Sequence, residues 1–79
     1  MNNQDRLKRV LSDVLSIPAS EINEDSSVDN VSTWDSFRHM NLVLALEGEF
    51  GISFTEEQTV EIISYGLIRS VLAEHGVQF

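Results

Sequence analysis

Three residues within five positions have side chains suited to nucleophilic chemistry: Asp35, Ser36 and His39. Ser36 and His39 stand at i and i+3, so a helix would place both on one face. A hydrolytic triad also needs a substrate cleft and oxyanion donors at the reacting carbon. A chain of 79 residues has little room for these. We therefore interpret the cluster as a helix-capping serine near a solvated histidine, and we expect no catalytic residue here.

Metal and nucleotide patterns are weak in this sequence. Asp25 and Asp29 stand four positions apart, but residues 25–30 lack the alternating ligands and central glycine of a calcium loop. His39 and His75 have no ligand spacing, and the chain contains no cysteine. Neither a P-loop nor a GxGxxG motif occurs, and no cleft is expected to hold paired carboxylates. We expect no metal site and a protein that is not an enzyme.

Ser36 itself keeps one further possibility open. It stands where a long acidic segment meets the start of a predicted helix, and the amide hydrogens of a helix N-terminus favour an anion by about 0.3–1 kcal/mol. A phosphate ester on this hydroxyl would be well placed. From the residues alone, ordinary helix capping is the preferred explanation of Ser36, and Ser26, Ser27, Ser32 and Ser64 also fall in predicted loops or caps.

Four segments carry helical patterns that would position this serine. Apolar residues at i, i+3, i+4, i+7 and i+8 predict a first helix over Asn3–Ser16, which Ile17-Pro18 ends. A second helix, capped by Asp35 or Ser36, runs from Ser36 to Phe50. Thr55 to Gln58 reads as a capping box that opens a short third helix through Ile63, and Ser64 caps a fourth that reaches Gly76. The sequence predicts an all-α fold: a small four-helix bundle of three main helices and one short helix, forming a single domain over residues 1–79.

Residues 17–35 form a long connection between the first two helices. They show no sustained apolar period, although Pro18–Ile22 has the composition of a single helical turn. Four apolar residues are spaced as anchors that would pin the loop to the core: Ile17, Ile22, Val28 and Val31.

The second helix is apolar around more of its circumference than simple packing needs. Leu42, Val43, Leu46 and Phe50 form the stripe expected to face the core. Phe37, Met40 and Leu44 form an adjoining stripe, for which two explanations stay open. The three residues either pack against the long loop and the third helix or form a contact surface for a partner.

Charge and length restrict the class of protein further. Thirteen acidic residues against five basic ones give a formal charge of −8, which argues against nucleic-acid binding and favours partners with basic patches. The longest apolar run, Leu42–Leu46, is far too short for a membrane span or a signal-peptide core. We expect a soluble cytoplasmic monomer that does not bind membranes.

The segments Trp34-Asp35-Ser36-Phe37 and Leu42 to Ile52 resemble the attachment region of an acyl carrier protein, a small phosphopantetheine-binding domain. That family has an aspartate–serine–hydrophobic triplet opening a helix that ends in an acidic residue, phenylalanine and a turn. The resemblance implies that Ser36 receives 4'-phosphopantetheine from coenzyme A through a phosphopantetheinyl transferase. It also implies that Asp35 helps to position the serine and a magnesium ion in the transferase complex. Phe37 stands where the family usually has leucine.

The same resemblance implies a non-catalytic carrier that holds acyl or aminoacyl groups as thioesters and is recognised by acyl-loading and acyl-using enzymes with basic docking patches. The residues expected to contact these enzymes are Phe37, Arg38, Met40, Leu44 and Glu47.

One departure from the family concerns the early second helix. General fatty-acid carriers usually place acids there, whereas Arg38 to Asn41 contain none. Together with Trp34, this favours a carrier of a specialised pathway, such as one making a polyketide, a peptide, or a modified lipid or sugar. The alternative is an unmodified acidic helical module that binds one protein partner through charge and the stripe of Phe37, Met40 and Leu44.

Overall fold

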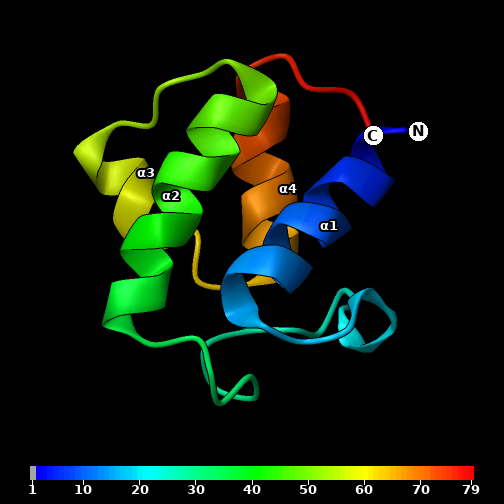
Figure 1. Cartoon of the computed structure of the whole chain (residues 1–79). Helices are drawn as coiled ribbons and strands as arrows, with labels where there is room; N and C mark the ends of the chain where they lie inside the picture. The colour runs from blue at the N-terminus through cyan, green and yellow to red at the C-terminus, as the bar shows by residue number, and fades with distance from the viewer. Residues whose placement is uncertain (1) are drawn as a thin grey trace.

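The computed structural model describes residues 2–79, which form four α-helices and one short 3-10 turn (Figure 1). The elements follow in the order α1 (Asn3–Leu15), η1 (Ala19–Glu21), α2 (Ser36–Phe50), α3 (Glu56–Glu61) and α4 (Tyr65–Glu74). No β-strand occurs among the described residues. The predicted all-α fold, with three main helices and one short helix, is confirmed. In the part described, no helix combines the length and apolarity needed to cross a membrane.

The first helix ends one residue earlier than its apolar pattern predicts. The Asn2 side chain caps its start by accepting from the Asp5 amide at 2.8 Å. Its end is fixed by Ser16, which adopts a left-handed conformation with φ of 58° and ψ of 41°. The Ser12 hydroxyl then donates to the Ile17 carbonyl oxygen, so the helix closes before Pro18 is reached.

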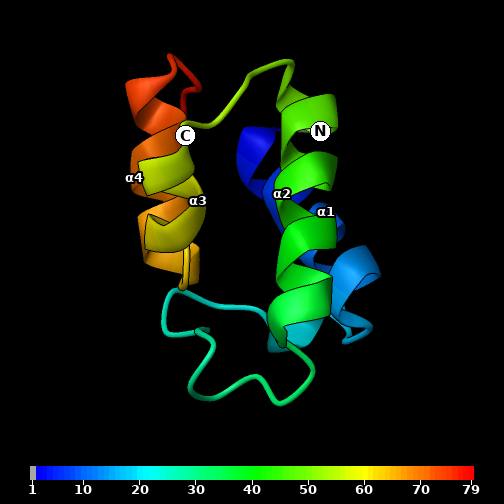
Figure 2. The same cartoon turned by 90° about the vertical axis from the view of Figure 1, so that its left-hand side faces the viewer.

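The long loop is anchored to the body of the protein, as the spacing of its apolar residues predicts. The predicted turn within Pro18–Ile22 is present as η1, and Ile22 is buried. Farther along, the Val28 amide donates to the Ile63 carbonyl at 3.0 Å, and the Tyr65 amide donates to the Ser26 carbonyl at 2.8 Å. Figures 1 and 2 show the loop crossing one end of the bundle before it rises into α2.

These two hydrogen bonds also explain why α3 is shorter than predicted. The helix ends at Glu61 rather than Ile63, because the chain turns at Ile62, with φ of −80° and ψ of 59°, and the next residues pair with the loop. This pairing includes an isolated bridge between Ser27 and Ser64. Both predicted caps around this segment are confirmed. Thr55 and Gln58 form a reciprocal capping box, and the Ser64 hydroxyl accepts from the Leu67 amide at 3.1 Å.

The core lies between α1, α2 and α4, closed at one end by the loop. Leu67 continues the apolar spacing of α4 but is 44% exposed. In contrast, Tyr65 and Trp34 are buried, although the sequence pattern assigned neither to the core. The buried apolar residues form one cluster: Leu7, Val10, Leu11, Leu15, Ile22, Trp34, Leu42, Val43, Leu46, Ile62, Tyr65, Ile68, Val71 and Leu72.

Candidate functional site

Asp35 caps the start of α2. Of the two residues predicted for this role, Asp35 and Ser36, it is therefore the aspartate that has it. Its Oδ1 accepts from the Arg38 amide at 2.8 Å, and its carbonyl oxygen accepts from the His39 amide at 2.8 Å. Ser36 is therefore the first helical residue, and it is exposed. Because Asp35 satisfies the third amide of the helix, the hydroxyl of Ser36 is not needed for capping.

Ser36 lies at the edge of a largely apolar groove between the loop, α2 and α3. The groove has a volume of about 590 Å³. In Figure 2, α3 stands in front of α4 and faces α2 across this region. The lining residues are Val28, Trp34, Asp35, Ser36, His39, Met40, Thr59, Val60 and Ile63. A serine at the first turn of a long helix thus opens onto a surface suited to a flexible, mostly apolar chain.

His39 is not solvated, so our interpretation of this residue was wrong. Its ring is half-buried and stacks on Trp34, with the ring centroids 6.3 Å apart and the planes 24° from parallel. Nδ1 lies 3.1 Å from the indole nitrogen of Trp34, and Nε2 lies 2.7 Å from the carbonyl oxygen of Thr59. Because both ring nitrogens have partners other than Ser36, the histidine is not placed to act as a general base for the serine hydroxyl.

The second apolar stripe of α2 faces solvent. Phe37, Met40 and Leu44 are 74%, 59% and 65% exposed, so packing against the loop and α3 does not explain their apolar character. Arg38, beside them, is half-buried and directs its guanidinium to the Leu15 carbonyl oxygen at 3.4 Å. The surface next to Ser36 is consequently apolar, with the arginine at its margin.

Both acids of α2 are used inside the fold. Glu47 accepts from the Phe54 amide at 2.8 Å, which ties the end of α2 to the segment that enters α3. Glu49 pairs with the Nε of Arg6 at 2.8 Å, and the same guanidinium lies over the Phe50 ring at 4.7 Å. Glu47 therefore has a structural contact in addition to the partner-contact role expected from the resemblance.

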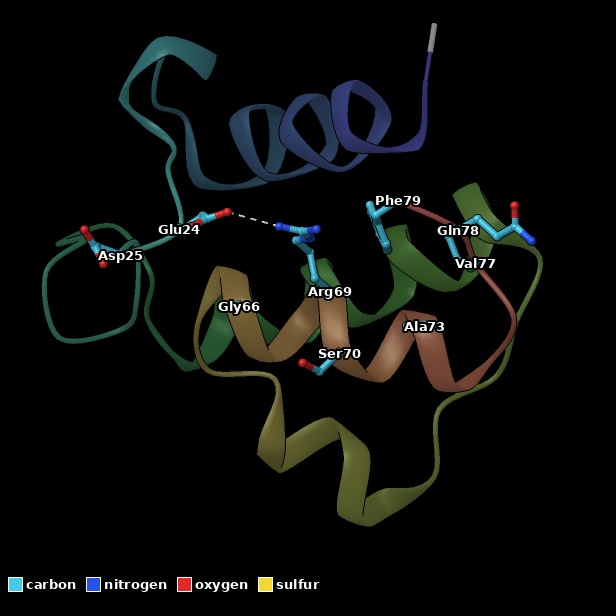
Figure 3. Close-up of a pocket in the computed structure, with 9 residues that line it drawn as sticks. All are labelled: Glu24, Asp25, Gly66, Arg69, Ser70, Ala73, Val77, Gln78 and Phe79. Carbon is cyan, nitrogen blue, oxygen red and sulfur yellow. Dashed lines mark hydrogen bonds and ion pairs between the residues drawn. The ribbon is translucent and has the colours of Figure 1, made fainter.

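A larger hollow, of about 860 Å³, lies on another part of the molecule between the loop, α4 and the C-terminal residues. Figure 3 shows Arg69 extending from α4 toward Glu24, and the two side chains pair at 3.2 Å. The Arg69 guanidinium also lies 5.3 Å from the centre of the Phe79 ring. Ser70 is the one hydroxyl among its lining residues in the described chain, and no histidine accompanies it. The groove beside Ser36 is therefore the stronger candidate for chemistry.

Comparison with known families identifies the class of this site. The family model for the phosphopantetheine attachment site matches residues 5–66, a span that includes every residue lining the groove. The chain belongs to this family. Its members carry 4'-phosphopantetheine covalently on a serine and do not catalyse reactions themselves. The chain is therefore a phosphopantetheine-carrying protein of the acyl-carrier type.

The residues around Ser36 fit such a group. The first amides of α2 and the helix dipole favour the phosphodiester's negative charge next to the serine. The apolar lining from Val28, Met40, Val60 and Ile63 would accommodate the alkyl parts of the arm. When bound, the group supplies a terminal thiol that holds acyl groups as thioesters, and the fold supplies the anchorage and the surface around it.

Sequence reasoning nominated Ser36 and Asp35 as site residues but did not identify the residues on the other side of the groove. Thr59 acts through its backbone carbonyl, so no side-chain pattern identifies it. A backbone hydrogen bond across 35 positions brings Val28 and Ile63 together, and no sequence pattern predicts it. The sequence shows Trp34 as an aromatic residue two positions before the serine, but it does not predict that this side chain is buried.

Proposed function

We propose that Ser36 is the serine that carries 4'-phosphopantetheine, and that the protein presents acyl or aminoacyl groups on it to separate enzymes. The observation that carries the proposal is its position: an exposed hydroxyl on the first residue of α2, relieved of capping by Asp35, at the edge of the apolar groove. Loading would join Ser36 Oγ to the pantetheine-bearing phosphorus of coenzyme A. The 3',5'-ADP portion would leave, and the hydroxyl proton would pass to a base of the transferase.

The other serines in the matched span are less suitable. Ser26 is buried, Ser12 donates to the Ile17 carbonyl, and Ser64 is occupied as the cap of α4. Ser27 accepts from the Asp29 amide at 3.2 Å. The remaining serines of residues 5–66 lie outside the α-helices, where no aligned helical amides favour a phosphodiester: Ser16, Ser20, Ser32 and Ser53.

Asp35 is proposed to keep the magnesium-positioning role that the family resemblance implies. The residue is exposed, so its carboxylate remains accessible to a transferase while it caps the helix. We propose that Phe37, Arg38, Met40 and Leu44 form the contact surface for the transferase and for acyl-handling enzymes. Glu47 stands at the far margin of this surface, where its bond to the Phe54 amide leaves less of the carboxylate free.

We propose further that the partners belong to a specialised pathway rather than to general fatty-acid synthesis. The support is the composition of α2: its exposed stripe is apolar, Arg38 follows the serine by two positions, and Glu47 and Glu49 are engaged internally. A general ketoacyl synthase that depends on acidic side chains along α2 should therefore accept this carrier poorly. Equal acceptance of this chain and of the general carrier would contradict the assignment.

One measurement tests attachment at Ser36. The protein is incubated with coenzyme A, magnesium and a broad-specificity phosphopantetheinyl transferase, and its intact mass is recorded. We expect a single added phosphopantetheinyl group, lost in Ser36→Ala and retained in Ser32→Ala, which removes another exposed serine nearby. No mass shift in the folded wild-type protein would favour the unmodified interaction module, whose partner binding would survive Ser36→Ala.

The protein is also proposed to act as a monomer made of one domain. A single buried cluster joins residues from α1, α2 and α4 with residues of the loop, which supports one folding unit. Light scattering before and after loading with coenzyme A would test the monomer.

A further inference from the structure

His39 links three parts of the molecule that surround Ser36. Its own backbone belongs to the second turn of α2, its Nδ1 meets the indole of Trp34 in the loop, and its Nε2 meets the carbonyl oxygen of Thr59 in α3. Trp34 precedes Ser36 by two positions and is buried. One imidazole ring therefore fixes the chain on both sides of the serine and ties it to the helix across the groove.

The partners of the ring determine which nitrogen carries the proton. An indole N–H can only donate, so Nδ1 must accept and must be unprotonated. A carbonyl oxygen can only accept, so Nε2 must carry the hydrogen. His39 is thus the neutral Nε2–H form. Protonating Nδ1 would place two donors against each other 3.1 Å apart and break the bond to Trp34.

We propose that neutral His39 is a positioning residue for phosphopantetheine transfer: it holds the Trp34–Ser36 turn against α3 so that the serine hydroxyl is presented in one orientation. This rests on the proposed attachment at Ser36. Asp35 restrains the same turn from inside the helix through the Arg38 amide, and the histidine restrains it from outside. Losing the outside restraint leaves α2 intact but lets the residues before Ser36 vary in position.

The charges around the ring are few. Of the described residues that line the groove with His39, Asp35 has the one other titratable side chain, and it lies four positions before His39 on the same helix end. Arg38 directs its guanidinium away, toward the Leu15 carbonyl. The acids of α3, the helix packed against the ring, are all exposed: Glu56, Glu57 and Glu61. The contacts on which the proposal rests are therefore the two hydrogen bonds of the ring, to Trp34 and to Thr59.

The test is a competition in one tube. Wild-type protein and one variant are mixed with limiting transferase, coenzyme A and magnesium, and their intact masses distinguish the two products. At low conversion, the ratio of modified fractions gives the ratio of kcat/KM and cancels the transferase's own pH dependence. His39→Gln keeps a donor toward Thr59, His39→Asn keeps an acceptor toward Trp34, and His39→Ala keeps neither. Trp34→Phe removes the indole donor while retaining an aromatic ring.

We expect His39→Ala to fall furthest behind near pH 8, by more than the roughly fivefold loss that one hydrogen bond of ordinary net strength would cause. His39→Asn and His39→Gln should each recover part of the rate. His75→Gln is the matched control, because His75 bonds Gln58 and does not line the groove, and its ratio should stay near one at every pH.

Nitrogen NMR of the apo protein gives a second readout that does not depend on loading. It should show an unprotonated Nδ1 and a protonated Nε2 on His39. An Nδ1–H form, or equal rates for folded His39→Ala and wild type, would overturn the role of His39. If His39→Ala does not fold, the Gln and Asn variants decide. Failure of wild type itself to be modified would instead overturn attachment at Ser36.

Discussion

Tyr65→Phe should stabilise the protein, because the phenolic hydroxyl is buried without a hydrogen-bond partner. The side chain is fully buried at the start of α4, and its oxygen contacts no donor or acceptor within residues 2–79. An unsatisfied buried polar group costs about 1–3 kcal/mol. Removing the oxygen leaves a gap of roughly methyl size, which costs about 1 kcal/mol. The expected net gain in the free energy of unfolding is about 1 kcal/mol, or roughly 4–8 °C in Tm for a domain of this size.

The same burial predicts a distinctive pH dependence. Burial raises the pKa of the Tyr65 phenol above its usual value of about 10, assisted by Glu24 and Asp5 and opposed by Arg69. Above about pH 10 the unfolded chain loses the phenolic proton while the folded protein keeps it. Wild-type stability should therefore fall with rising pH by up to about 1.4 kcal/mol per unit, until the folded pKa is reached. Tyr65→Phe lacks this contribution.

Urea unfolding followed by the fluorescence of the single, buried tryptophan measures both effects. The free energy of unfolding of Tyr65→Phe minus that of wild type should be positive at pH 7 and should increase above pH 10. Thr33→Val is the matched control, since its Oγ1 is also buried without a partner in the described chain but does not titrate. The stability that Thr33→Val gains by losing this unpaired hydroxyl should not change with pH. A loss of more than about 1 kcal/mol in Tyr65→Phe at pH 7 would mean that the hydroxyl has a partner, and would refute the reasoning.

Three further predictions concern caps and charge. Ser16 and Gly51 end α1 and α2 in nearly the same left-handed conformation, with φ of 58° and 65°. Ser16→Gly should therefore raise, and Gly51→Ser lower, the free energy of unfolding by about 1 kcal/mol each in urea titrations; equal effects of one sign would contradict this. Glu47→Gln should lower stability by about 1 kcal/mol, because the Phe54 amide loses a charged acceptor; an unchanged urea midpoint would show that the bond contributes little. Added salt or magnesium should raise Tm by screening the charge of −8, and a salt-independent transition would exclude repulsion as a destabilising cause.

The parts of the fold that the sequence predicts are those with local causes. The period of Leu7, Leu11 and Leu15 defines α1, and the caps at Thr55 and Ser64 set the starts of α3 and α4. Each of these signals depends on residues within one or two helical turns. The end of α3 was misjudged because its cause is distant: residues 63–65 pair with the loop more than 30 positions earlier.

The same distinction explains the candidate site. Ser36 and Asp35 could be nominated because a helix start is a local feature with recognisable residue types, and the resemblance to a known family added the attachment role. The environment of His39 could not, since its partners lie 5 and 20 positions away and one of them is a backbone carbonyl. A histidine at i+3 from a serine suggests a catalytic pair when the sequence alone is considered. The actual hydrogen bonds assign its ring to holding the structure around the serine.

Around Ser36, two tasks fall to different residues: attracting a partner by charge and contacting it in the bound complex. Glu47 and Glu49 are engaged within the fold, so the proposed contact residues of α2 are apolar apart from Arg38. The exposed acids lie outside this stripe, on α1, α3 and α4 and in the loop. Charge outside the contact surface raises the rate of encounter with a basic partner but adds little to the bound contact. It acts over roughly a Debye length, about 8 Å at physiological salt. We therefore expect salt to slow association with partner enzymes, while truncating Phe37 or Leu44 speeds dissociation.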